Sequence, residues 1–140
     1  MTQPAGRAAA ADAAPGPTPA SQWLTVNRRL DGDRFSPLRQ ITPTNVSHLA
    51  EVCRVQIDGP TTLEAGIVVA GGVIYTDTGT ETVALDATDC AVRWKHRYIP
   101  EEERYSPSNR GLAVMDGRVF RGTGDARLIA LDAQTGKLLW

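Results

Sequence analysis

The 140-residue sequence lacks the features that mark several functional classes. Fifteen lysines and arginines stand against sixteen aspartates and glutamates, which leaves a formal net charge of −1. This balance does not indicate a nucleic-acid-binding face or a charged tail. No apolar run approaches the roughly 18 residues that a membrane-spanning helix requires. The chain has two cysteines and two histidines, and they are not spaced as a metal site would need.

The first 22 residues, MTQPAGRAAAADAAPGPTPASQ, also have almost nothing to bury. They are alanine, proline and small polar residues, a composition that predicts disorder. They contain no run of Leu, Val or Ile, so they do not form the apolar core of a signal peptide. The tail of a longer leader is an alternative interpretation.

The rest of the chain contains an internal repeat. The first unit is GIVVAGGVIYTDTGTETVALDATDCAVRW (Gly66–Trp94), and the second is GLAVMDGRVFRGTGDARLIALDAQTGKLLW (Gly111–Trp140). Glycine, aromatic residue, "ALDA" and tryptophan recur in the same order at an offset of 45 to 46 residues. A repeat of this length sets the architecture before any local pattern does.

Each unit predicts a four-stranded antiparallel meander. Gly71-Gly72 and Asp116-Gly117 separate β-branched runs, which is typical of two-residue hairpin turns with positive φ. In the first unit we expect strands at Ile67–Ala70, Val73–Thr76, Thr82–Leu85 and Ala91–Trp94. In the second unit the third strand is expected at Arg127–Leu131 and the fourth at Lys137–Trp140. Repeated four-stranded meanders predict an all-β fold, with the units as blades of a β-propeller.

The residues that recur at the ends of the two units have a structural explanation. The aspartate of "ALDA" can accept hydrogen bonds from the following turn, and the glycine of "TG" suits the left-handed conformation. Trp94 and Trp140 are each large and flat with one N–H donor, so we expect them to wedge between adjacent blades and donate across the junction. A ligand contact is the alternative role.

The sequence resembles the N-terminal part of the quinoprotein alcohol dehydrogenases, which use pyrroloquinoline quinone (PQQ). The most distinctive part is "RFSPLRQITPTNV", within the segment Trp23–Val52 that looks like the lead-in of this family. "SNRGLAV" (Ser108–Val114) resembles the opening of the family's second blade, and "LDAQTGKLLW" resembles its tryptophan-docking repeat. The resemblance implies about two blades of an eight-bladed propeller, with a lead-in at 23–60, a first blade at 61–98 and a second at 108–140.

The resemblance implies two cofactor-binding residues. Glu64 stands where the family often has an acidic residue near PQQ, and Arg110 stands where it has an arginine against the PQQ rings. The chemistry suits Arg110, because a planar guanidinium that is always charged matches a planar tricarboxylate. A surface ion pair for Arg110 and a solvated carboxylate for Glu64 are the alternatives.

The sequence also departs from the family. Many members carry two adjacent cysteines shortly before "NRG", whereas this chain has "EEERYSPSNRG" there. Its cysteines are Cys53 and Cys90, which form a disulfide if the protein is exported and are otherwise two free buried thiols. The family's calcium ligands, catalytic aspartate and quinone-stacking tryptophan belong to later blades. No catalytic base is identified here, and we expect the sequence to be a truncated one of low stability by itself.

Two functions follow as hypotheses. The first is part of a periplasmic PQQ- and calcium-dependent dehydrogenase that oxidises an alcohol or sugar hydroxyl, passes hydride to the quinone and delivers electrons to a cytochrome or quinone acceptor. The second is a non-catalytic PQQ-like propeller that serves as a binding or assembly scaffold. The fold alone does not distinguish them.

Overall fold

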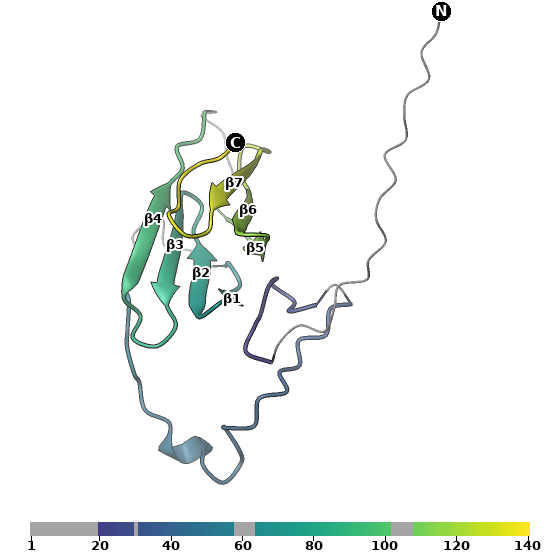
Figure 1. Cartoon of the computed structure of the whole chain (residues 1–140), viewed down its shortest axis with the longest axis vertical. Helices are drawn as coiled ribbons and strands as arrows, with labels where there is room; N and C mark the ends of the chain where they lie inside the picture. The colour runs from purple at the N-terminus through teal and green to yellow at the C-terminus, as the bar shows by residue number, and fades with distance from the viewer. Residues whose placement is uncertain (1–19, 30, 58–63, 102–107) are drawn as a thin grey trace, which may run out of the picture.

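A computed structural model describes residues 20–29, 31–57, 64–101 and 108–140, which form two antiparallel sheets side by side (Figure 1). The only helical element in these ranges is one short 3-10 turn, η1 (Val46–His48). The disorder expected for residues 1–22 falls almost wholly outside the described residues. The described part of the repeat is all β, as the sequence predicts.

The first repeat forms a four-stranded meander in the order β1-β2-β3-β4. Its strands are β1 (Val68–Ala70), β2 (Val73–Asp77), β3 (Glu81–Asp86) and β4 (Val92–Arg97). Gly71 and Gly72 have φ values of 56° and 75°, so the β1–β2 turn uses the left-handed conformations that the Gly-Gly pair predicts. The predicted blade is confirmed, with β4 reaching three residues beyond Trp94.

The second repeat forms only three regular strands. These are β5 (Leu112–Met115), β6 (Arg118–Gly122) and β7 (Leu128–Asp132), in that order. The predicted fourth strand at Lys137–Trp140 is wrong as a strand, because a single bridge between Leu131 and Leu138 is all that is assigned. Backbone hydrogen bonds still hold this segment beside β7, from Leu139 to Ala130 and from Ala130 to Trp140.

The core lies between the two sheets. The alternation of the strands turns one set of apolar side chains inward, and they form a single cluster: Val68, Val73, Tyr75, Ala84, Trp94, Leu112, Val114, Val119, Ile129 and Leu131. The sheets touch through β1 and β2 of the first and β5 of the second. Face-to-face packing of twisted sheets is how propeller blades bury their apolar surface.

Trp94 joins the two sheets, as predicted. Its Nε1 donates a 3.0 Å hydrogen bond to the carbonyl of Ala133 in the second sheet. Tyr75 supports it, with ring centroids 5.9 Å apart and a 3.1 Å hydrogen bond from its hydroxyl to the same carbonyl. The indole lies against Gly136, where a Cβ atom would come within 2.5 Å of Cε3 of Trp94. Gly136 is therefore required by its φ of 72° and by the lack of space.

Trp140 does not take the equivalent place between sheets. Its ring lies 6.2 Å from that of Phe120 in its own sheet, and 57% of the residue is exposed. The contact repeats the Tyr75–Trp94 ring pair of the first sheet. The predicted inter-blade role stays a prediction for Trp140.

The "ALDA" aspartates organise the turns that follow them. Asp86 accepts hydrogen bonds from the backbone and hydroxyl of Thr88, and Asp132 accepts from Thr135 in the same way. The hydroxyl and backbone bonds from Thr135 lower the pKa of Asp132. Cys90 replaces the glycine of the first turn and still adopts a φ of 61°, an unusual conformation for a residue with a side chain.

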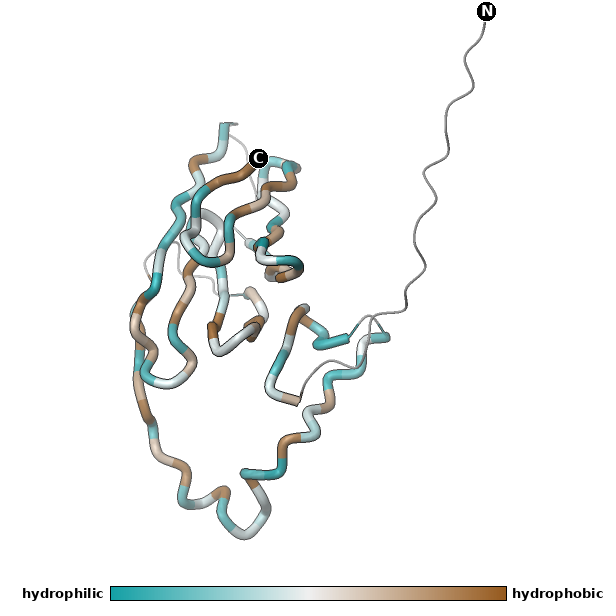
Figure 2. Tube along the Cα trace, in the orientation of Figure 1, coloured by the Kyte–Doolittle hydropathy of each residue, from teal (hydrophilic) through white to brown (hydrophobic). Residues whose placement is uncertain are grey.

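The lead-in covers the sheets only at its start. Trp23 pairs with Val69 of β1 through two backbone hydrogen bonds of 2.7 and 2.8 Å, and the Leu24 carbonyl accepts from Val114 of β5. From residue 31 to 57 the chain runs in a wide loop away from the sheets, with several hydrophobic residues exposed (Figure 2). Of the lead-in Trp23–Val52, only the first residues therefore cover the blades, because the later ones meet no apolar face.

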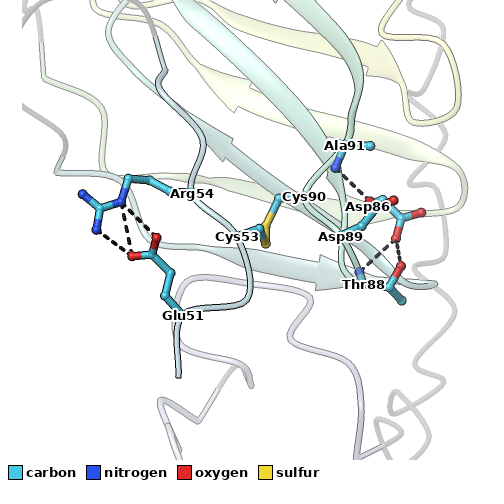
Figure 3. Close-up of a disulfide and its surroundings, with 8 residues drawn as sticks. All are labelled: Glu51, Cys53, Arg54, Asp86, Thr88, Asp89, Cys90 and Ala91. Carbon is cyan, nitrogen blue, oxygen red and sulfur yellow. Dashed lines mark hydrogen bonds and ion pairs between the residues drawn. A yellow bond between two sulfur atoms is a disulfide. The ribbon is translucent and has the colours of Figure 1, made fainter. Parts of the chain in front are cut away.

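A disulfide between Cys53 and Cys90 ties the end of this loop to the β3–β4 turn (Figure 3). The Cα atoms are 6.1 Å apart, within the normal range for a disulfide. The bond closes a 37-residue separation in the sequence. It restrains a long segment that has little apolar contact of its own.

Arg121 and Asp77 form a buried ion pair where the sheets meet. Both side chains are fully inaccessible, with Nε of Arg121 3.7 Å from Oδ2 of Asp77. The guanidinium also donates to the Thr82 hydroxyl and to the carbonyls of Thr78 and Gly79. Neither oxygen of Asp77 has a hydrogen-bond partner among the described residues. Burial raises the pKa of Asp77 to about 6, although the charge of Arg121 opposes this.

We predict that Gly136→Ala destabilises the protein more than Gly117→Ala. Both glycines have φ near 70°, but a Cβ at Gly117 meets no atom within 4 Å. Gly117→Ala should therefore cost about 1–2 kcal/mol of unfolding free energy from backbone strain alone, and Gly136→Ala about 1–3 kcal/mol more from overlap with Trp94. Urea denaturation at unchanged m-value measures both. Equal losses would show that Trp94 does not need the space above Gly136.

We predict that protein purified from an oxidising compartment has no free thiol. Counting thiols in denaturant without reductant should give none, and the same sample after reduction should give two, from Cys53 and Cys90. Two free thiols before reduction would contradict the disulfide.

We predict that Asp77 makes the protein less stable as pH rises. The folded-state pKa of about 6 exceeds the ordinary value of 3.8, so the favourable contribution is complete below pH 4 and is lost as pH rises through 6. Relative to Asp77→Asn, the wild type should lose about 3 kcal/mol of unfolding free energy between pH 4 and pH 7. Asp132→Asn should show the opposite sign in a lower pH range, because the pKa of Asp132 is lowered below the ordinary 3.8 and its contribution disappears only as pH falls below 4. Denaturation curves of Asp77→Asn between pH 4 and 7, and of Asp132→Asn below pH 4, decide the matter. Parallel pH profiles for Asp77→Asn and the wild type would refute the prediction.

Candidate functional site

The structure places the two predicted cofactor residues at the same end of the neighbouring sheets. Glu64 precedes β1 and Arg110 precedes β5, and the backbone N–H of Gly66 donates to the Arg110 carbonyl at 3.4 Å. The Ser108 hydroxyl donates to Oε1 of Glu64 at 3.3 Å. Both predicted side chains are exposed. The two segments are therefore joined, although no ion pair between Glu64 and Arg110 is present.

Asn109 holds the segment that carries Arg110. Its amide Nδ2 donates to the carbonyl of Gly122 at the end of β6, over 2.8 Å, and its Oδ1 accepts from the backbone N–H of Gly111 at 3.1 Å. Gly111 adopts a φ of 123°, which few residues with a side chain tolerate. These contacts fix the backbone conformation on both sides of Arg110.

Val26 of the lead-in fills the space between the two segments. A Cβ on Gly66 would lie 2.9 Å from Cγ1 of Val26, and a Cβ on Gly111 would overlap the same side chain. Two glycines thus allow the lead-in to lie against the starts of β1 and β5. From the sequence, Val26 was assigned to the lead-in, but its contact with the segment that carries Arg110 was not predicted.

A pocket of about 410 Å³, largely open to solvent, lies at this junction, and its volume is within the normal range for ligand sites. The lining residues come from the lead-in and from the start of β5: Thr25, Val26, Asn27, Arg29, Arg110, Gly111 and Leu112. The cavity combines an apolar wall with two guanidinium groups. No acidic side chain lines it within the described part of the chain.

Arg110 has no hydrogen bond or ion pair from its side chain to any described residue, so its charge is available to a ligand. The alternative of a surface ion pair receives no support from these residues. Among the described residues, Glu64 has the Ser108 hydroxyl as its hydrogen-bond partner. The arrangement suits a ligand that carries a carboxylate or another planar anion.

A second polar cluster lies at this end of the sheets and was not foreseen. The Tyr98 hydroxyl donates to both oxygens of Asp125, at 2.9 and 2.7 Å, and Arg127 forms an ion pair with Glu101. Hydrogen bonds, led by that from Thr123, lower the pKa of Asp125 to about 2. All these groups satisfy one another, so the cluster secures the loop between β6 and β7. The sequence shows only an ordinary turn, "GTGDAR", at this point.

The remaining candidates lie elsewhere. Cys53 and Cys90 are at the opposite end of the first sheet, in the β3–β4 turn, away from Arg110. No group of three His, Cys, Asp or Glu side chains among the described residues is arranged to hold a metal ion. No helix within the same residues is long and apolar enough to cross a membrane.

Comparisons with known proteins show the family to which this chain is similar. Residues 23–139 match the family model described as PQQ, glucose/ethanol/alcohol dehydrogenase, β-propeller domain. The chain is 38% identical over 96% of its length to the quinohemoprotein alcohol dehydrogenase ADH-IIG of Pseudomonas putida, of which it spans 19%. It is also 38% identical, over 85% of its length, to the 1-butanol dehydrogenase (cytochrome c) of Thauera butanivorans, of which it spans 18%.

Solved structures show the same likeness. The structure of Pseudomonas putida ADHIIG matches with a TM-score of 0.78 and 36% identity, covering 86% of this chain and 19% of that one. The quinohemoprotein alcohol dehydrogenase of Comamonas testosteroni matches with a TM-score of 0.77 and 31% identity over the same shares. This chain thus spans about a fifth of the relatives it matches. On the family match and these relatives, it belongs to the PQQ family of glucose, ethanol and alcohol dehydrogenase β-propeller domains.

Proposed function

We propose that this chain supplies part of the cofactor-binding end of a PQQ-dependent dehydrogenase, with Arg110 as a contact to the cofactor. One observation carries the proposal. Arg110 lines a pocket between the lead-in and the start of β5, and its guanidinium has no partner among the described residues. An unpaired arginine in a cavity is a ready site for a carboxylate.

The donor set fits PQQ, a planar tricarboxylate with a quinone and a pyrrole N–H. Arg110 supplies a fork of donors for a carboxylate, and Val26 and Leu112 supply apolar wall for the ring system. Glu64 is an acceptor for an N–H group, and the Ser108 hydroxyl steadies it at 3.3 Å. These residues bind and orient the cofactor, and none of them is placed to remove a proton from a substrate.

The whole protein would oxidise the hydroxyl group of an alcohol or a sugar. PQQ, when bound, accepts the hydride from the substrate carbon. The Thauera butanivorans relative is named for a cytochrome c acceptor, so a cytochrome is the acceptor we propose. We further propose a calcium ion beside the quinone, held by residues other than those described, and a periplasmic location, which the Cys53–Cys90 disulfide supports.

We predict that Arg110→Ala weakens PQQ binding about ten- to hundredfold, because a hydrogen bond to a charged group contributes about 1.5–3 kcal/mol. Arg110→Lys should be intermediate, since an ammonium keeps the charge and loses the planar fork. Titration calorimetry with PQQ measures the affinity.

Arg118→Ala is the matched control. Arg118 is an exposed arginine at the other end of the same sheet, beside the Asp116-Gly117 turn. The Arg118→Ala variant should bind PQQ with the same affinity as the wild type. Unchanged affinity in Arg110→Ala, or no PQQ binding by any variant, would contradict the proposal and favour the scaffold function.

A further inference from the structure

The cavity beside Arg110 has a second cation, Arg29, which comes from the lead-in. A tight turn places it there: the N–H of Arg28 donates to Thr25 over 2.8 Å, and the N–H of Arg29 donates to Asn27 over 2.8 Å. Arg28 adopts a φ of 66° at this turn. The turn leaves the flanking residues, Asn27 and Arg29, on the cavity wall.

The lead-in is held firmly against the sheets where it carries Arg29. Backbone hydrogen bonds join Trp23 to β1, and another joins Leu24 to β5. Val26 occupies the space over Gly66 and Gly111. Packing on both sheets therefore fixes the backbone just before Arg29, and Arg29 lines the same pocket as Arg110.

The charges around the cavity favour an anion. Arg28, next to Arg29, is only 7% exposed, and its Nε has no partner among the described residues. Arg29 has one ion pair, with Asp31 at 3.2 Å, and both side chains are 54% exposed. Such a surface pair contributes little and is easily exchanged for a ligand. Two guanidinium groups on one cavity match a ligand with more than one carboxylate.

We propose that Arg29 and Arg110 bind two separate carboxylates of one planar polycarboxylate. This inference rests on the proposed function, in which that ligand is PQQ. It assigns to the lead-in a direct part in holding the cofactor and makes Arg29 a residue that determines specificity for polycarboxylates. Asp31 is its competitor in the absence of the ligand.

The test uses the full 140-residue chain and four variants, titrated with PQQ by calorimetry. Arg29→Ala should weaken binding about tenfold, as expected for one charge-assisted contact. Arg29→Lys should be intermediate. Asp31→Asn should strengthen binding, because it frees Arg29. Circular dichroism spectra should be unchanged, since Arg29 is exposed.

Arg54→Ala is the matched control. Arg54 also belongs to the long segment before the first sheet and forms an exposed ion pair, with Glu51, but it lies beside the disulfide (Figure 3). Its removal should leave PQQ affinity unchanged. Equal weakening in Arg54→Ala and Arg29→Ala would mean a general effect of net charge and would overturn the inference.

A second readout tests the pairing with several carboxylates. Benzene-1,3,5-tricarboxylate should bind the wild type more tightly than benzoate does, and Arg29→Ala should abolish most of that difference. PQQ binding that depends on Arg110 but not on Arg29 would overturn this inference and leave the proposed function intact. Loss of dependence on both arginines would overturn both.

Discussion

The contact of Trp94 with the second sheet is the interaction on which the rest of the structure depends. Its indole spans the junction, donates to the Ala133 carbonyl and lies on Gly136, which has no side chain to hinder it. The rest of the junction consists of the apolar core cluster and of the contacts that Arg121 makes with the first sheet. The alignment that the Trp94 contact imposes also brings the Gly66 and Arg110 segments within hydrogen-bond distance at the opposite end.

The two ends of the paired sheets are stabilised by different kinds of interaction. One end carries the aspartate turns and the disulfide, where hydrogen bonds and a covalent bond hold the chain together. The other end carries Arg110, Arg29 and the buried pair Arg121–Asp77, where charges gather. Burying Arg121 and Asp77 costs solvation that their 3.7 Å contact only partly returns, as the raised pKa of Asp77 shows. The contribution of Asp77 to stability therefore falls as pH rises. The contribution of the turn aspartate Asp132 changes in the opposite direction, because its pKa is lowered.

The repeat made much of the fold predictable. Paired glycines marked the hairpins, alternation marked the strands, and the tryptophan marked the junction, because each of these signals is local or recurs at a fixed period. Arg110 and Glu64 were found through resemblance to a family. The failures concern segments whose state depends on a neighbour: residues 137–140, which pair only once, and the lead-in after residue 31, which meets no apolar face.

The sequence by itself determined the blades, their turns and the nature of the candidate ligand contact at Arg110. These depend on backbone preferences, on side-chain alternation and on the chemistry of one residue. Only the tertiary structure decided that Arg29 shares a cavity with Arg110, that Val26 requires glycine at 66 and 111, and that Arg121 meets Asp77. Each of these brings together residues at least 40 positions apart in the sequence. Local pattern carries no information on such contacts, because they arise from the way the lead-in and the two blades pack together.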